Sequence, residues 1–234
     1  FSKDIYRRIE EQDRSGLDYI FSWHGNTELI IAIIKLIEDK MNADEDIREG
    51  GVQAILLVED SIRFYSTYLP EIYKLLLLQN TEFLKDAFNE QQQVLRKRAR
   101  PKILLARCYE EAVELYERYK KNLLGVISDV DDTIMVTQAP RLMKAAYNLL
   151  LLNPRKKVPV ASMNLLFNRI ADMFTDAPFF YLSTSPWNVE SSIRHFITNH
   201  GFPEGPLLLR DLDRFADATA RMDSQCPLGS GALA

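Results

Sequence analysis

The chain has 234 residues, of which 47% are hydrophobic and 26% are charged, and its formal net charge at pH 7 is -4. These values are typical of a globular protein with room for one large or two small domains, and they exclude a chain-wide basic field of the kind that binds nucleic acid. No apolar run is long enough to cross a bilayer. The two cysteines, Cys108 and Cys226, lie in dissimilar contexts that predict neither a disulfide framework nor a metal site, so we expect a reducing, cytoplasmic location. Because the first residue is Phe1 rather than Met, we also expect a fragment of a longer chain.

The first half of the chain alternates helical and strand patterns. The expected elements, in order, are a helix and turn over 1–25, a helix over 29–41, a buried strand over 52–58, a helix over 62–78, a strand over 102–106 and a helix over 109–121. Pro70 lies inside the helix expected over 62–78 and predicts a kink or a break near Leu69.

The second half continues the alternation. A strand is expected over 123–128, followed by a loop over 134–140, helices over 141–152 and 162–174, and a strand over 179–182. Ser185 and Pro186 then look like an N-cap and a first helical residue, opening a helix that stops at Gly201. A last strand is expected over 207–209. The whole pattern predicts an α/β protein of three layers, doubly wound around a mostly parallel sheet.

Acidic residues follow the strand expected at 123–128. Asp129, Asp131 and Asp132 stand at its end, with Thr133 next to them. In open α/β sheets, ligands bind beyond the carboxyl ends of the strands, and clustered carboxylates are usually compensated by a hard divalent cation. One carboxylate can then attack a phosphoryl group while a second, two residues further on, protonates the leaving oxygen. The spacing of Asp129 and Asp131 suits this division of roles.

The segment Asp129-Val-Asp-Asp-Thr133 resembles the DxDxT motif of haloacid dehalogenase (HAD) phosphatases, and 128–134 resembles its form in the actin-patch phosphatidate phosphatase family. The similarity continues through 179–188 and 201–211. The resemblance implies a HAD-like fold, Mg²⁺ as cofactor, and an aspartyl-phosphate mechanism. It also implies that Asp129 is the nucleophile and a metal ligand, that Asp131 is the acid and base with its backbone carbonyl on the metal, that Thr133 shapes the loop, and that Ser183 binds the phosphoryl oxygens.

The same resemblance implies a phosphorylated small molecule or lipid headgroup as substrate, with phosphatidate favoured. Peripheral contact with a membrane is a further expectation; the basic turn at 153–157 is suited either to an anionic surface or, as a solvated loop, to water. The resembled phosphatases also use a later basic residue and a further acidic loop. The residues after 213 carry no such pattern, and we expect neither Asp211 nor Asp213 to replace it.

The first half resembles a response-regulator receiver-like domain of the kind found with bacterial phosphoenolpyruvate- and pyruvate-binding enzymes. The residues that carry the resemblance are 24–27, 55–61, 100–105 and 124–129. It implies a flavodoxin-like sheet in which Glu59 and Asp60 hold Mg²⁺ and Asp129 accepts the phosphoryl group.

Both resemblances include Asp129, so we infer a composite or truncated chain joined at about 129–131. We expect three segments. Residues 1–122 form a receiver-like segment, residues 123–213 form an incomplete HAD-like phosphatase segment, and residues 214–234 form a disordered tail. The leading hypothesis for function is Mg²⁺-dependent phosphomonoester hydrolysis. The alternatives are a receiver-like phosphoacceptor or regulatory module of a phosphorelay, and an inactive fragment. The oligomeric state is left open.

Overall fold

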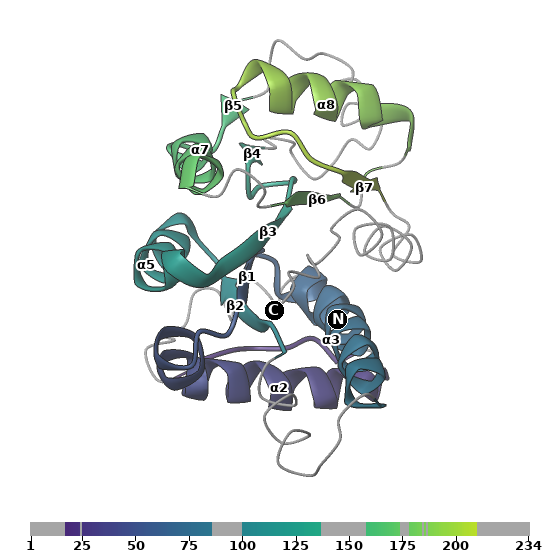
Figure 1. Cartoon of the computed structure of the whole chain (residues 1–234). Helices are drawn as coiled ribbons and strands as arrows, with labels where there is room; N and C mark the ends of the chain where they lie inside the picture. Colours follow the sequence, from purple (N-terminus) through teal and green to yellow (C-terminus); the bar gives the residue numbers. More distant parts are fainter. Residues whose placement is uncertain are drawn as a thin grey trace.

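The computed structural model describes residues 17–23, 25–85, 100–136, 158–173, 178–183, 185 and 187–209 (Figure 1). Several expectations lie outside these residues: the helix expected at 141–152, the basic turn at 153–157, the tail expected at 214–234, and Asp211 and Asp213.

One sheet of five parallel strands forms the centre of the fold. Its strands are β1 (Ala54–Val58), β2 (Lys102–Ala106), β3 (Leu123–Asp129), β6 (Phe179–Ser183) and β7 (Leu207–Leu209). They lie in the order β2-β1-β3-β6-β7, so β3 is central and strands from both halves of the chain share one sheet. All five were predicted from apolar runs, with ends within two residues of those observed.

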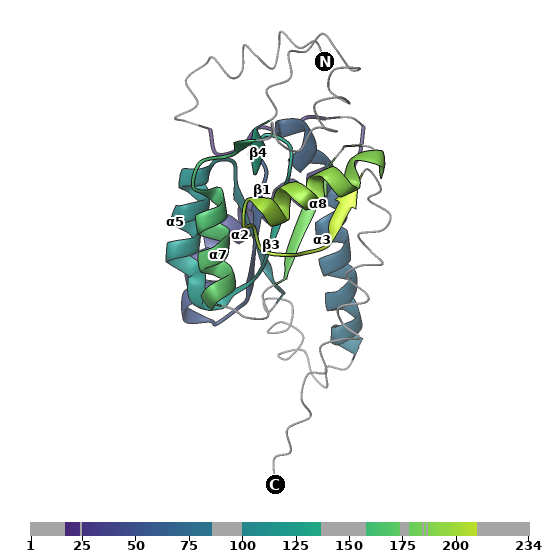
Figure 2. The same ribbon diagram turned by 90° about the horizontal axis from the view of Figure 1, so that it is seen from above.

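Helices cover both faces of this sheet, which confirms the predicted three-layer α/β fold (Figures 1 and 2). Side chains of α2 (Glu28–Ala43) and α3 (Ile62–Lys85) pack against one face. Those of α5 (Tyr109–Tyr119), α7 (Met163–Met173) and α8 (Glu190–Asn199) pack against the other. Short irregular helices follow α2 and α5 and precede α8, at Asp44–Glu49, Lys120–Asn122 and Trp187–Val189.

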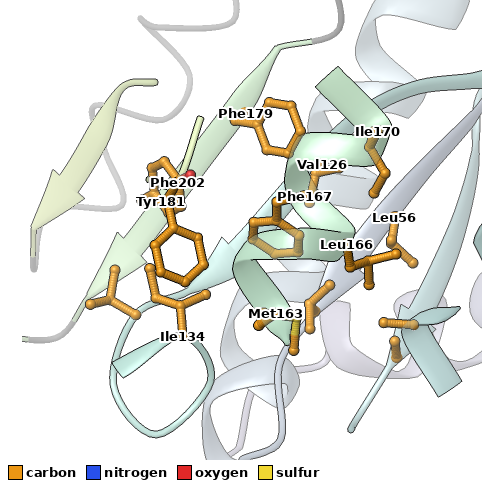
Figure 3. Close-up of a cluster of buried hydrophobic side chains, with 14 of the residues drawn as sticks. Leu56, Val126, Ile134, Met163, Leu166, Phe167, Ile170, Phe179, Tyr181 and Phe202 are labelled. Carbon is orange, nitrogen blue, oxygen red and sulfur yellow. The ribbon is translucent and has the colours of Figure 1, made fainter. Parts of the chain in front are cut away.

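Neighbouring residues of each strand enter different cores because side chains alternate between the faces of a sheet. Leu56 and Val126 pack with α7 in the first core, shown in Figure 3, whereas Leu57 and Ile127 pack with α2 and α3. The strands are therefore buried on both faces. This explains why they appear in the sequence as continuous apolar runs rather than as an alternating pattern.

Of the kink or break predicted near Leu69, the break does not occur, because α3 runs without interruption from Ile62 to Lys85. A proline inside a helix costs about 3 kcal/mol. Burial of a large apolar side chain returns roughly 1.5–3 kcal/mol, and Leu69, Ile72 and Tyr73 around the proline are all buried on the sheet. Tertiary packing therefore outweighs the local cost.

The segment expected as a loop after Thr133 instead contains a short strand. β4 (Met135–Val136) pairs in antiparallel fashion with β5 (Val158–Pro159). Two-residue strands are too short to give a periodic signal in the sequence. None of the helices in the described ranges is long and apolar enough to traverse a bilayer.

Candidate active site

The carboxyl ends of β1, β3 and β6 meet at one edge of the sheet, because the three strands are parallel neighbours. Val58 is paired with Ser128, and Asp129 is paired with Leu182. The residues that follow in this register are Glu59 after β1 and Ser183 at the end of β6. Adjacent strands lie about 4.8 Å apart, so the sheet itself brings these side chains together.

Asp129 and Glu59 are both fully buried, with exposed fractions of 1% and 0%. Among the residues that the structure describes, neither carboxylate oxygen of Asp129 has a hydrogen-bond partner, and the same is true of Glu59 Oε2. Glu59 Oε1 accepts a hydrogen bond from the Ser61 amide at 2.9 Å. Buried carboxylate oxygens without partners are costly, so this edge of the sheet holds two acids whose charge is not compensated by the described residues.

Burial raises the pKa of Asp129 well above its ordinary range, and the negative charges of Glu59, Asp131 and Asp60 raise it further. The nearby Val130 amide, which donates its hydrogen bond to the Leu182 carbonyl, opposes the shift in the pKa of Asp129 only in part. Burial likewise raises the pKa of Glu59. The Ser61 amide partly opposes that shift, while Asp60 and Asp131 add to it. Both effects penalise the charged forms of the two acids, and a cation between them would reverse the penalty.

The carboxylate of Asp131 is held by two serine hydroxyls from the end of β6. Ser183 Oγ donates a hydrogen bond to Asp131 Oδ2 at 2.8 Å, and Ser185 Oγ donates to the same oxygen at 3.4 Å. Ser183 Oγ in turn accepts a hydrogen bond from the Ser185 amide at 3.1 Å. Asp131 is therefore oriented by groups that lie more than fifty residues further along the chain.

A tight turn after β3 positions Asp131. The Val130 amide donates to the Leu182 carbonyl, and the Met135 amide donates back to the Val130 carbonyl. Asp132 adopts the left-handed conformation, with φ of 65°, which aspartate tolerates better than most residues. Thr133 is buried, and its hydroxyl donates to Asp60 Oδ1 at 3.4 Å. Thr133 thus links the turn to the end of β1, and its expected role in shaping the loop stays a prediction.

All the predicted site residues lie at this edge: Asp129, Asp131, Thr133, Ser183, Glu59 and Asp60. Sequence reasoning assigned Ser183 to phosphate binding, whereas in the structure its hydroxyl contacts Asp131. From the sequence, Ser185 is expected only as a helix cap, yet its hydroxyl donates a hydrogen bond to Asp131.

Tyr68 of α3 was not predicted as a site residue. It is buried, and its pKa is raised by burial and then by the charges of Asp129 and Glu59. No sequence pattern signals Tyr68, because it lies within an ordinary apolar helix face.

The donor chemistry at this edge fits a hard divalent cation such as Mg²⁺. Such ions bind carboxylate and carbonyl oxygens, and the unpartnered oxygens of Asp129 and Glu59 are of this kind. Within the described ranges, no three Asp, Glu, His or Cys side chains are placed as a complete metal site. Mg²⁺ commonly takes only one or two protein carboxylates and completes its shell with water and substrate phosphate, so two are sufficient.

Comparison with known proteins finds one similarity, in the second half of the chain. Residues 124–225 match a family model described as "Phosphatidate phosphatase APP1, catalytic domain". Neither the curated proteins nor the solved structures include a significant match. The match does not extend to residues before 124, so the resemblance of the first half to a receiver stays a prediction. The segment that carries Asp129, Asp131, Thr133 and Ser183 is similar to the catalytic domain of a phosphatidate phosphatase, as its motifs predicted.

Proposed function

We propose that this protein hydrolyses phosphomonoesters with the help of Mg²⁺, and that its substrate is phosphatidate or a similar lipid phosphate. The observation that carries the proposal is that two acids close together at the end of β3 have different surroundings. Asp129 is buried, and neither of its carboxylate oxygens has a hydrogen-bond partner in the described part of the chain, whereas Asp131, two residues on, is held by serine hydroxyls. The family match to a phosphatidate phosphatase domain supports the choice of substrate.

In the first step, an Oδ atom of Asp129 forms a bond to phosphorus as the bond from phosphorus to the ester oxygen breaks. Asp131, in its protonated form, gives its proton to the departing oxygen, so the alcohol leaves neutral. The product on the protein is an acyl phosphate at Asp129. Ser183 and Ser185 keep the Asp131 carboxyl aimed into the site during this step.

In the second step, Asp131 accepts a proton from water as that water attacks phosphorus. The bond from phosphorus to Asp129 breaks, and inorganic phosphate and the free carboxylate are released. When bound, Mg²⁺ supplies positive charge that offsets the charge of the phosphoryl oxygens. Asp129 and the backbone carbonyl of Asp131 would hold it.

A membrane-embedded substrate requires contact with a lipid surface. Trp187 begins the short helix two residues after Ser185, and the residue is 47% exposed. Tryptophan favours the boundary between lipid headgroups and acyl chains. We therefore include peripheral contact with a membrane in the proposal, with the cytoplasm as the location.

A second candidate function is phosphoacceptor chemistry without turnover, as in a receiver. It is favoured by the place of Glu59 and Asp60 beside Asp129, the arrangement that the resemblance of the first half implies. The two functions differ in the fate of the acyl phosphate. Hydrolysis needs Asp131 as acid and base, whereas a receiver keeps the phosphoryl group and does not need that carboxyl.

The test compares the wild-type chain with Asp129→Asn, Asp131→Asn and the exposed control Asp172→Asn, using p-nitrophenyl phosphate and phosphatidate in detergent micelles with Mg²⁺. We expect turnover in the wild type and the control, and a loss of at least about a hundredfold in both site variants. Stoichiometric phosphorylation that stops after one event, unaffected by Asp131→Asn, would favour the receiver-like function. A folded wild type that does neither would contradict both.

A further inference from the structure

The helix α2 carries large apolar residues on its outward face as well as on the face that packs against the sheet. Ala32 and Leu36 are fully buried and belong to the core that α2 shares with α3. On the outward face, five large apolar residues have exposed fractions between 42% and 79%: Ile30, Ile31, Ile34, Ile37 and Met41. A helix that is apolar all round is normally buried on all sides. We therefore expect another surface to cover the outward face of α2.

These five residues form one continuous patch, the α2 strip. Ile30, Ile34, Ile37 and Met41 are separated by four, three and four positions, the repeat that lines up apolar side chains along one seam of a helix. With Ile31 beside them, they present on the order of 500 Å² of apolar surface, at the upper end of the patches that monomeric proteins expose. A standard interface buries about 800 Å² on each partner, and about two thirds of a homodimer interface is apolar. The α2 strip therefore matches the apolar area that one side of a dimer needs.

We infer that the α2 strip is the surface through which two copies of this chain associate, with their α2 helices packed in antiparallel orientation. The strip is complementary to itself in that orientation. A two-fold axis midway between Ile34 and Ile37 sets Ile34 of one copy opposite Ile37 of the other, and Ile30 opposite Met41. Interfaces with this symmetry, in which both copies use the same patch, are the commonest among soluble oligomers.

The charges beside the strip favour a second copy as the partner. Lys35 and Glu38 lie on the same side of α2, where they form an ion pair of 2.5 Å within one copy. In an antiparallel pair, the same side of both helices meets, so Lys35 of each copy comes near Glu38 of the other. Opposite charges then face each other twice across the interface. The two charges are balanced in sign, whereas helices that lie on anionic membranes are rich in lysine and arginine.

The proposed interface lies away from the candidate active site. α2 lies next to the edge strand β2, at the opposite end of the molecule from α8 (Figure 1). The strands that carry Asp129 and Ser183 are β3 and β6, in the middle and on the other side of the sheet. The inference is therefore independent of the proposed function, and a dimer would leave both candidate active sites open.

The first experiment measures self-association of the full chain by sedimentation velocity over a range of protein concentrations. The test variant is Ile34→Glu, and the control is Leu165→Glu, which makes the same change at an exposed leucine of α7. We expect the wild type to dimerise and Ile34→Glu to raise the dimer Kd by at least about a hundredfold, because it places a charge at the centre of the packed seam. Leu165→Glu should resemble the wild type. A monomeric wild type, or wild-type affinity in Ile34→Glu, would overturn the inference.

A charge exchange tests the identity and the orientation of the partner. Lys35→Glu and Glu38→Lys should each raise the dimer Kd by at least about threefold, because each brings like charges together twice across the interface. The double variant Lys35→Glu/Glu38→Lys should recover wild-type affinity. Circular dichroism would show that each variant is folded, as expected for substitutions at partly exposed positions.

Affinity that is unchanged in both single variants, or that is not recovered in the double variant, would overturn the antiparallel pairing of two copies. A membrane is the competing partner. A wild type that stays monomeric and binds vesicles containing phosphatidate, with binding lost in Ile34→Glu and kept in Leu165→Glu, would assign the α2 strip to a lipid surface and refute the dimer.

Discussion

Ser183 at the end of β6 donates a hydrogen bond to Asp131 in the turn after β3, over 2.8 Å. This contact joins the two adjacent strand ends that carry the proposed chemistry. We predict that Ser183→Ala lowers kcat on p-nitrophenyl phosphate by roughly tenfold to a hundredfold, because Asp131 loses its closer hydroxyl and its orientation. Steady-state kinetics beside Ser191→Ala, an exposed serine of α8, would test this. Equal kcat in the two variants would contradict the role of Ser183.

Asp129→Asn should stabilise the protein in the absence of divalent cations. Burial and neighbouring acids raise the pKa of Asp129 in the folded state above its unfolded value of about 4. The stability due to this group is therefore fully present below about pH 4 and is lost as pH rises through the raised pKa. At pH 7 with chelator, we expect the Tm of Asp129→Asn to exceed that of the wild type by about 3 °C or more, the shift that about 1 kcal/mol causes in a chain of this size.

The control for that measurement is Asp172→Asn, on the exposed side of α7, which should leave Tm nearly unchanged. Melting curves across pH should show the gap between Asp129→Asn and the wild type closing towards pH 4. A gap that is absent at pH 7, or that widens on acidification, would show that Asp129 is not held in an unfavourable charged state.

A buried ion pair joins α2 to the residues just before β2. The carboxylate of Asp39 accepts hydrogen bonds from both Arg100 terminal nitrogens, at 2.5 and 2.9 Å, and from the Tyr73 hydroxyl and the Ile103 amide. Arg100→Ala would leave a buried carboxylate without its main partner, at a cost of about 3–5 kcal/mol. We expect a fall in Tm of about 10 °C or more.

Arg118→Ala serves as the comparison for Arg100→Ala, because Arg118 pairs with Asp44 at the surface and its loss should change Tm little. The fall in Tm of the double variant Asp39→Ala/Arg100→Ala should be smaller than the summed falls of the two single variants, since the double variant leaves neither charge of the pair without its partner. Equal Tm losses from Arg100→Ala and Arg118→Ala would refute the importance of the buried pair.

Trp187→Ala should lower the activity on lipid substrates more than the activity on water-soluble ones. The side chain is exposed beside the site and makes its proposed contribution at the membrane surface. We predict that kcat/KM falls at least severalfold for phosphatidate in vesicles and stays within about twofold for p-nitrophenyl phosphate, a water-soluble ester. A parallel loss on both substrates would place Trp187 in a general structural role.

The strands of the sheet could be predicted from the sequence because each strand is an apolar run that ends in polar residues. The apolar run before Asp129, for example, predicted β3 to within one residue. Contacts between segments that are distant in the sequence could not be predicted from it. Nothing local indicates that the hydroxyls of Ser183 and Ser185 converge on Asp131, or that packing keeps α3 intact through Pro70.

The close approach of β3 to the start of β6 is a further contact of this kind. A Cβ atom at Gly125 would lie 2.8 Å from the Pro178 carbonyl oxygen. Only glycine avoids that clash. The requirement arises from Pro178, which is more than fifty positions further along the chain, so no pattern around Gly125 reveals it.

The most direct test of the central claim is to follow phosphorylation of Asp129 during turnover. The chain would be mixed with p-nitrophenyl phosphate and Mg²⁺, quenched in acid at short times, digested and analysed by mass spectrometry. We predict a phosphoryl group on Asp129 that is present during turnover, disappears once substrate is exhausted, and is absent in Asp129→Asn. Sustained turnover without phosphorylated Asp129, or turnover retained in Asp129→Asn, would contradict the account.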